Sequence, residues 1–321
     1  MIIYNCSEPC SGYAIAASGI HSERFRTVYA FDNNCWDSKS QQYKLLAVQN
    51  YNANFRHDDG SPVCHLQDIR DVTGSMILDA VGNNSNWKSN HFMFGGPPCQ
   101  QWTPLNACAT DTGTEKCELI LEYVRLVKEA RPLVAVMEQV PEFITIKNPE
   151  KKKIRDDFFR EMGKIGYKCA YTILNASDYG VAQNRERAFV MFVRNDLGID
   201  PIFPKPIYPR VPITKFIPID GFRSGHFGEP MKSVELFPQV CTVTSSSPYL
   251  FFKGVDSWKP TIQELLLCQS IDPTTYRHVG SYSKLRKGIG NGIPAMLAYH
   301  ISKCVRENIL DVAFKQKPEL F

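Results

Sequence analysis

Residues 115–137 read EKCELILEYVRLVKEARPLVAVM, and this stretch carries the clearest signal for the fold. In its first part, residues 115–131, apolar side chains recur every three or four positions, which predicts an amphipathic helix. The second part, residues 133–137, is apolar throughout and has the length of a strand that is buried on both faces. A helix followed at once by such a strand is typical of a parallel sheet covered by helices.

The segments around this unit extend the same pattern. Residues 91–94 (HFMF) predict a strand just before the helix. Near the start of the chain, residues 2–6 and 27–31 predict two more strands, with a helix of small residues over 13–18 between them. We therefore expect an α/β domain with a mostly parallel sheet, completed by a carboxyl-terminal helix. In such sheets, ligands bind beyond the carboxyl ends of the strands.

Composition bounds the class of protein. The chain has 321 residues, of which 43% are apolar and 22% charged, so it can bury a large core. No stretch approaches the roughly 20 apolar residues of a membrane span, and no leader-like segment opens the sequence, so we expect it to act inside a cell. Its eleven cysteines lack metal-ligand spacing, which predicts free thiols and no structural metal. A net charge of +4 permits a polyanionic partner without requiring one.

A turn that follows the strand of residues 91–94 places a thiol where a ligand would bind. The sequence there is Gly95-Gly96-Pro97-Pro98-Cys99-Gln100. Prolines stiffen the backbone, and glycines allow a ligand to approach it closely. The alternative is a tight turn with an incidental buried cysteine, which is common. We interpret Cys99 as a candidate nucleophile.

Three carboxylates fall at the ends of predicted strands or in the loops that follow. Asp32 is placed to accept hydrogen bonds from ribose hydroxyls, or else to cap the next helix. Asp68 is placed to hold an exocyclic amine while Ile69 covers a ring face, although loop aspartates usually cap turns. Glu138 emerges at the mouth of a buried strand, where desolvation raises the pKa of a carboxyl and suits it to proton transfer.

Five motifs occur in an order that resembles the DNA cytosine-5 methyltransferase family. They are the Gly95 to Gln100 turn, Met137-Glu138-Gln139-Val140, Gln183-Asn184-Arg185-Glu186-Arg187, the helix from Pro260 to Gln269, and Ile289-Gly290-Asn291-Gly292-Ile293-Pro294. The likeness covers most of the chain. It implies a Rossmann-like, class I S-adenosylmethionine-dependent methyltransferase fold with a mostly parallel sheet and a small target-recognition domain.

The resemblance also implies how the chain is divided and what it binds. Residues 1–194 would form the catalytic and cofactor-binding domain, residues 195–258 the recognition region, and residues 259–321 a helical segment that returns to the catalytic domain. The implied partner is double-stranded DNA, bound by a monomer without metal or membrane. The compartment is the cytoplasm of a bacterial or virus-infected cell, or the nucleus of a eukaryote, and restriction–modification is one implied setting.

Site roles follow from the same resemblance. Cys99 would attack C6 of a flipped cytosine, Glu138 would hold N3, Arg187 would face O2, and Arg185 would hold nearby loops. The implied S-adenosylmethionine contacts are Ser11, Gly12, Asp32, Asp68, Ile69, Pro97 and Asn291. The implied nucleic-acid contacts are Gln100, Thr103, Arg223 and Ser224.

The sequence also departs from the family pattern. The loop of residues 6–12 keeps a single glycine where the family is glycine-rich, and Gln139 replaces an expected asparagine. The recognition region is short and proline-rich; we expect a polar loop at residues 221–226 and a strand at 240–244. Two alternatives remain: a transfer-RNA cytosine-5 methyltransferase on the same scaffold, and a catalytically weakened nucleic-acid-binding relative.

Overall fold

The computed structural model describes residues 2–33, 41–85, 87–98, 102, 115–223, 230–243 and 250–321, with backbone only at 41–44 and 115–117. Its main sheet has seven strands in the order β3-β2-β1-β4-β5-β7-β6. The strands are β1 (Tyr4–Pro9), β2 (Phe25–Asp32), β3 (Cys64–Leu66), β4 (Phe92–Gly95), β5 (Val134–Gln139), β6 (Tyr167–Asn175) and β7 (Glu186–Arg194). Strands β1 to β5 pair in parallel, and β7 runs antiparallel between β5 and β6. The predicted mostly parallel sheet is confirmed.

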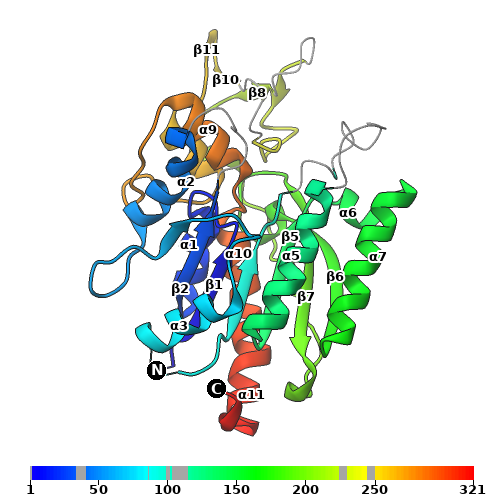
Figure 1. Cartoon of the computed structure of the whole chain (residues 1–321). Coiled ribbons are helices and arrows are strands. Elements are labelled where there is room, and N and C mark those ends of the chain that lie inside the picture. Colours follow the sequence, from blue (N-terminus) through cyan, green and yellow to red (C-terminus); the bar gives the residue numbers. More distant parts are fainter. Residues whose placement is uncertain are drawn as a thin grey trace.

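Helices cover both faces of this sheet (Figure 1). The described helices of the chain are α1 (Ile15–Ile20), α2 (Gln41–Asn54), α3 (Gly74–Asn84), α5 (Glu115–Ala130), α6 (Glu142–Thr145), α7 (Pro149–Lys164), α8 (Ile262–Cys268), α9 (Tyr282–Asn291), α10 (Ala295–Val305) and α11 (Asp311–Gln316). Helices α3, α5 and α7 lie on one face, whereas α1, α10 and α11 lie on the other. The arrangement is the α/β fold expected from the sequence.

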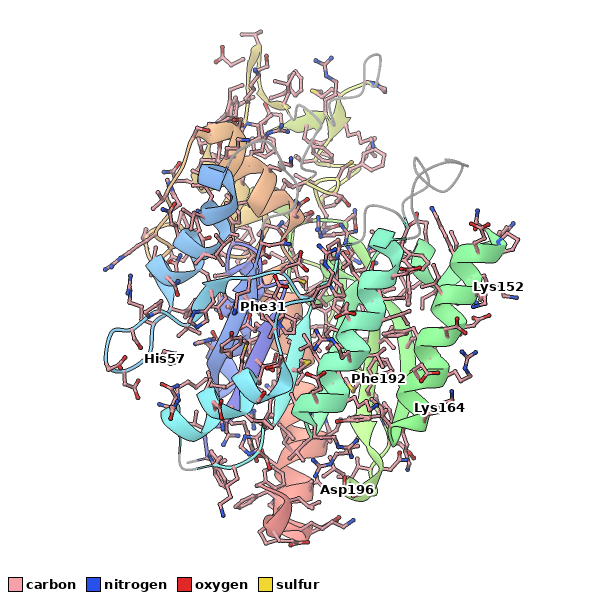
Figure 2. The ribbon with its side chains drawn as sticks, viewed as in Figure 1. Phe31, His57, Lys152, Lys164, Phe192 and Asp196 are labelled. Carbon is pink, nitrogen blue, oxygen red and sulfur yellow. The ribbon has the colours of Figure 1, made fainter. Side chains whose placement is uncertain are left out.

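The face under α5 and α7 is packed with aromatic side chains. Phe192 of β7 meets Phe158 of α7 edge to face, with ring centroids 5.4 Å apart. On the opposite side of α7, Lys152 and Lys164 point away from the sheet (Figure 2). This division of apolar and charged faces is what makes the helix amphipathic, and it holds α7 against the sheet.

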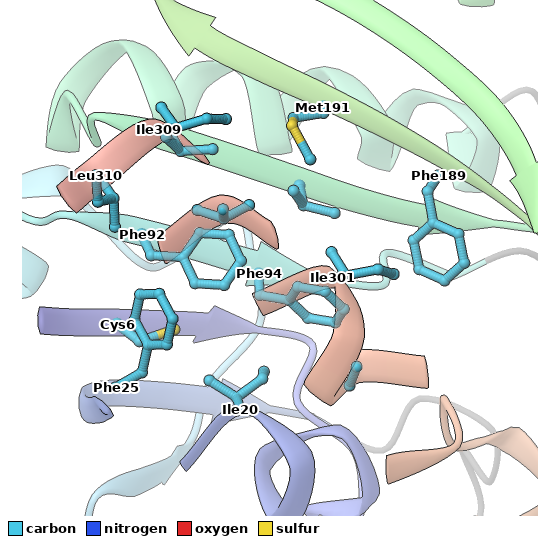
Figure 3. Close-up of a cluster of buried hydrophobic side chains, with 14 of the residues drawn as sticks. Cys6, Ile20, Phe25, Phe92, Phe94, Phe189, Met191, Ile301, Ile309 and Leu310 are labelled. Carbon is cyan, nitrogen blue, oxygen red and sulfur yellow. The ribbon is translucent and has the colours of Figure 1, made fainter. Parts of the chain in front are cut away.

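The other face joins the two ends of the chain. Phe92 and Phe94 of β4 pack against Ile301 of α10, and α10 continues through a π-helical turn at Arg306–Leu310 (Figure 3). Helix α1 lies so close to α10 that a Cβ built on Gly19 would stand 1.9 Å from the carbonyl oxygen of Ala295. The carboxyl-terminal helices are therefore part of the main domain.

A second, antiparallel sheet lies beyond the carboxyl ends of the main strands (Figure 1). Its strands are β8 (Gly221–Arg223), β9 (Lys232–Ser233), β10 (Leu250–Lys253) and β11 (Asp256–Trp258), in the order β11-β10-β8-β9. Phe222 and Phe251 of this sheet share a core with apolar residues of α8 and α9.

Two local expectations were wrong. Residues 221–223 form a strand rather than a polar loop, because Phe222 is fully buried. The described part of the strand expected at 240–244 makes one isolated bridge, between Gln183 and Val240. Two further hydrogen bonds of this segment involve side chains instead of a strand ladder. The Val243 amide donates to the side chain of Gln183, and the Thr242 hydroxyl donates to the Asn184 carbonyl.

Candidate active site

One pocket lies at the carboxyl ends of the central strands. Its described lining residues are Glu8, Cys10, Ser11, Gly12, Tyr13, Ile15, Ala16, Asp32, Asn33, Ala47, Phe94, Gly95, Gly96, Pro98, Glu138, Lys284, Lys287, Gly288, Asn291, Gly292 and Ile293. Asp32 ends β2 and Glu138 lies near the end of β5, with β1 and β4 between them. Three strand spacings, or about 14 Å, separate β2 from β5. The pocket thus connects the predicted cofactor residues with a predicted catalytic one.

The loop after β1 forms the end of the pocket near Asp32. The Gly12 amide donates to Oδ2 of Asp32 at 2.9 Å, and the Ser11 amide donates to the Phe31 carbonyl at 3.1 Å. Gly12 has a φ of +59°, a left-handed conformation that favours glycine, and a Cβ there would meet nothing within 4 Å. The loop's one glycine therefore lies where the backbone turns and where open space adjoins it.

Three of the predicted cofactor contacts lie elsewhere. Asp68 accepts hydrogen bonds from the Arg70 guanidinium and from Asn33, and the Arg70 hydrogen bonds lower the pKa of that carboxyl. Ile69 is buried in the core under α3 and α5. Asp68, Ile69 and Pro97 are not among the described lining residues, whereas Ser11, Gly12, Asp32 and Asn291 are.

Glu138 is held by an ion pair at the other end of the pocket. Its Oε1 lies 2.9 Å from Nε of Arg187, and the two side chains are only 10% and 17% exposed. Burial raises the pKa of Glu138, while the charges of Arg187 and Arg185 oppose the rise. A Cβ on Gly96 would stand 3.3 Å from Oε2 of Glu138, so the small residue leaves room beside the carboxyl. This carboxyl is suited to holding or sharing a proton.

Gln139 ties the end of β5 to the turn that precedes Cys99. Its amide nitrogen donates to the Pro97 carbonyl at 2.7 Å, and the side chain is fully buried. Among the described residues, its Oε1 has no hydrogen-bond partner. The glutamine that replaces the expected asparagine therefore reaches the turn and fixes the position of Pro97.

Arg185 is buried, and its guanidinium donates hydrogen bonds to backbone carbonyls. Its Nη1 donates to the carbonyls of Gly290, at 2.9 Å, and Val243, at 3.2 Å. Gly290 precedes Asn291, which lines the pocket. Arg185 thus joins β7 to the loop at Val243 and to the end of α9, which is a positioning role.

Sequence reasoning missed three polar residues. Buried Gln183 donates to the Cys268 carbonyl at 2.9 Å, and buried Gln269 donates to the Ile289 carbonyl at 2.6 Å. These amides join β7, α8 and α9, but no spacing rule distinguishes a buried glutamine from a surface one. Glu8 lines the pocket. A carboxyl at the end of the first predicted strand was the available signal for it.

Several predicted residues lie outside the described part of the chain: Cys99, Gln100, Thr103 and Ser224. Arg223 ends β8 with its guanidinium 5.9 Å from the centre of the Phe252 ring. Within the described ranges there is no group of three or more His, Cys, Asp or Glu side chains arranged to hold a metal. None of the helices described is both long and apolar enough to span a membrane.

Comparisons with known proteins agree with the motifs. Residues 4–218 match the family model described as C-5 cytosine-specific DNA methylase. The chain is 35% identical over 255 residues to the type II methyltransferase M.MthTI of Methanothermobacter thermautotrophicus, covering 75% of this chain and 65% of that protein. It is 26% identical to the type II methyltransferase M.FnuDI of Fusobacterium nucleatum, covering 88% and 87% of the two chains.

The fold is also similar to that of solved structures. A putative DNA modification methyltransferase encoded within a prophage of E. coli superposes with a TM-score of 0.69 at 18% identity. The match covers 96% of this chain and 99% of that one. At this identity the likeness concerns the fold, and both the main sheet and the smaller region take part in it.

Proposed function

Because this chain belongs to the family of C-5 cytosine-specific DNA methylases, we propose that it methylates C5 of cytosine in duplex DNA through a covalent bond between Cys99 and C6. The family resemblance inferred from the motifs is confirmed by this membership. The observation that carries the mechanistic proposal is the buried Glu138 carboxyl, paired with Arg187 and sharing one pocket with Asp32.

Cys99 supplies the nucleophile that the reaction requires. C5 of cytosine is too weak a nucleophile to accept a methyl group unaided. Addition of the Cys99 thiolate to C6 forms an S–C6 bond and moves the ring electrons to C5, which becomes nucleophilic. After methylation, a base removes the C5 proton, the S–C6 bond breaks, and the thiolate is restored. The link from Gln139 to Pro97 supports this role because it fixes the turn that leads to Cys99.

Glu138 and Arg187 offset the negative charge that develops on the cytosine ring. A carboxyl whose pKa is raised by burial retains a proton more readily, and that proton can be shared with N3 as negative charge develops. Arg187 holds one carboxyl oxygen of Glu138 and presents its guanidinium beside it, where O2 of the base would accept a hydrogen bond.

The pocket residues fit S-adenosylmethionine. That cofactor, when bound, supplies an electrophilic methyl group. Asp32 offers a carboxylate at the end of β2 for ribose hydroxyls, and the turn at Gly12 offers open space beside the backbone. Asn291 adds a polar side chain from the end of α9.

The DNA partner, the monomeric state and a cytoplasmic site of action in a bacterial or virus-infected cell are parts of the same proposal. A target base inside a duplex must be flipped out to reach a pocket at the strand ends. The description of the matching family, C-5 cytosine-specific DNA methylase, favours DNA over transfer RNA as the substrate. The small sheet of β8 to β11 adjoins α8 and α9, and we assign DNA contact to it.

Product analysis tests this function. The protein is incubated with methyl-labelled S-adenosylmethionine and with duplex DNA of varied sequence, transfer RNA or free deoxycytidine triphosphate, and modified nucleosides are identified by mass spectrometry. We expect 5-methyldeoxycytidine from duplex DNA alone. Label in transfer RNA would instead establish the alternative substrate, and tight DNA binding without any labelled product would indicate a non-catalytic relative.

A further inference from the structure

A buried carboxyl in the pocket has no role in the mechanism above. Glu8 lies near the end of β1, is 1% exposed, and is one of the lining residues. Its Oε1 accepts hydrogen bonds from the hydroxyl of Thr27 on β2 and, at 2.6 Å, from the hydroxyl of Tyr51 on α2. Three elements thus fix this side chain in one orientation.

The direction of these hydrogen bonds leaves one oxygen for a ligand. Thr27 donates its only hydroxyl proton to Glu8, so the 2.8 Å contact between Thr27 and Nε2 of His21 requires the imidazole to donate. Burial lowers the pKa of His21 to about 4, which keeps that ring neutral. Among the described residues both donors to Glu8 bond to Oε1, which leaves Oε2 able to accept from a ligand.

The electrostatic surroundings of Glu8 favour the neutral form of its carboxyl. In the described ranges no cation forms an ion pair with Glu8, and burial raises its pKa to about 7 against the opposing effect of the Thr27 and Tyr51 hydrogen bonds. Among the described residues, the other titratable or charged groups around the carboxyl and its pocket are Cys6, Cys10, Tyr13, His21, Asp32, Tyr51, Cys64, Glu138, Lys284 and Lys287. Near pH 7 this carboxyl is therefore divided between its neutral and charged forms.

We propose that Glu8 is the counter-charge for a positively charged group of the cofactor and loses its proton when the cofactor binds. This inference rests on the proposed use of S-adenosylmethionine. The matching group is either the sulfonium or the α-ammonium of that molecule. A cation beside Oε2 favours the carboxylate, so binding and deprotonation are linked. Glu8 is then a specificity-determining residue whose contribution depends on pH.

Calorimetry in buffers of different ionisation enthalpy tests the linkage. For the wild type at pH 7 we expect release of about half a proton per S-adenosylmethionine bound, since a group with a pKa of about 7 is half protonated there. As pH rises toward that pKa, the dissociation constant for S-adenosylmethionine should fall by up to about tenfold per pH unit. Glu8→Gln keeps an acceptor for Thr27 and Tyr51, and it should abolish the proton release and bind several-fold more weakly at pH 8. Glu161→Gln, on the exposed part of α7, should behave as the wild type.

Two further arms refine the test. Proton release with S-adenosylmethionine but not with S-adenosylhomocysteine assigns Glu8 to the sulfonium, and release with both assigns it to the α-ammonium. Tyr51→Phe removes one donor to the carboxylate and should shift the affinity profile to higher pH. Unchanged affinity and proton release in Glu8→Gln would overturn this inference alone. Failure of the wild type to bind S-adenosylmethionine at any pH would overturn the proposed function with it.

Discussion

Two carboxyls that looked alike in the sequence lie in opposite environments. Glu138 is buried beside Arg187, and burial raises its pKa. Asp68 accepts hydrogen bonds from Arg70 at the surface, and these lower its pKa. Both fall at or after predicted strands, so the sequence could identify them as candidates. Only packing shows which carboxyl has its pKa raised and which has its pKa lowered.

Replacing Glu138 by Gln tests its role in proton transfer. The substitution preserves the shape of the side chain but removes the group that shares a proton with N3. We expect the rate of methyl transfer in a single turnover to fall by about 10² to 10⁴-fold, while the affinity for S-adenosylmethionine stays within about twofold of the wild type. A variant that transfers methyl groups at the wild-type rate would remove Glu138 from the mechanism.

The raised pKa of Glu8 predicts how stability depends on pH. Its value of about 7 in the folded protein exceeds the ordinary value of 4.5, so the folded state binds the proton more tightly. The contribution of Glu8 to the free energy of unfolding is therefore greatest below pH 4.5 and declines as pH rises through 7. Relative to the wild type, Glu8→Gln should gain up to about 3 kcal/mol between pH 5 and pH 8 in urea unfolding. A difference that does not vary with pH would contradict the raised pKa.

At the scale of elements, the loop from β1 to α1 turns with a single glycine. Cys10 and Ala14 adopt left-handed φ values of 55° and 61° without being glycine. Such residues cost roughly 1 to 2 kcal/mol each, and the surrounding core must hold them in place. Ala14 is fully buried, and the Gly12 amide is bonded to Asp32. A loop poor in glycine can therefore still form the end of the pocket near Asp32.

Alanine substitutions separate backbone conformation from crowding in this loop. Neither Gly12 nor Gly82 of α3 has an atom within 4 Å of a built Cβ, but only Gly12 has a left-handed φ. We expect Gly12→Ala to lower the free energy of unfolding by about 1 kcal/mol. Gly82→Ala should raise it by about 0.5 to 1 kcal/mol because alanine favours a helix. Urea denaturation of both variants measures these changes in the free energy of unfolding. A shift of the same sign in both variants would contradict a conformational cost specific to Gly12.

At the scale of the whole molecule, the sequence predicted the class of fold better than its details. Apolar runs such as residues 133–137 identify buried strands, and the periodicity of α5 identifies a covering helix. The antiparallel position of β7 between β5 and β6 depends on contacts distant in sequence. The strands of the small sheet have two to four residues each, too few for a periodic signal. Gln183 and Gln269 lie in two of the quoted motifs, but the sequence assigned them no role because burial is a property of the folded chain.

Salt dependence tests how the molecule binds its polyanionic partner. Arg223 ends a strand of the small sheet, whereas the Arg210 guanidinium pairs with Asp178 at 2.6 Å. If Arg223 neutralises a phosphate, Arg223→Ala should weaken duplex binding and reduce the slope of log K against log salt by about 1. Arg210→Ala should leave that slope unchanged. Fluorescence anisotropy at four or more salt concentrations measures both, and equal slopes in Arg223→Ala and the wild type would exclude a phosphate contact by Arg223.

Covalent trapping tests the central claim most directly. Duplex DNA with 5-fluorocytosine at the target lacks the C5 proton whose removal frees the enzyme, so the protein should remain attached to C6 after methyl transfer. With S-adenosylmethionine present, we predict a denaturation-resistant adduct for the wild type and for Cys169→Ala, a control at an exposed cysteine of β6. Cys99→Ala should form none. An adduct that persists in Cys99→Ala, or none in the wild type on DNA that it methylates, would contradict the account.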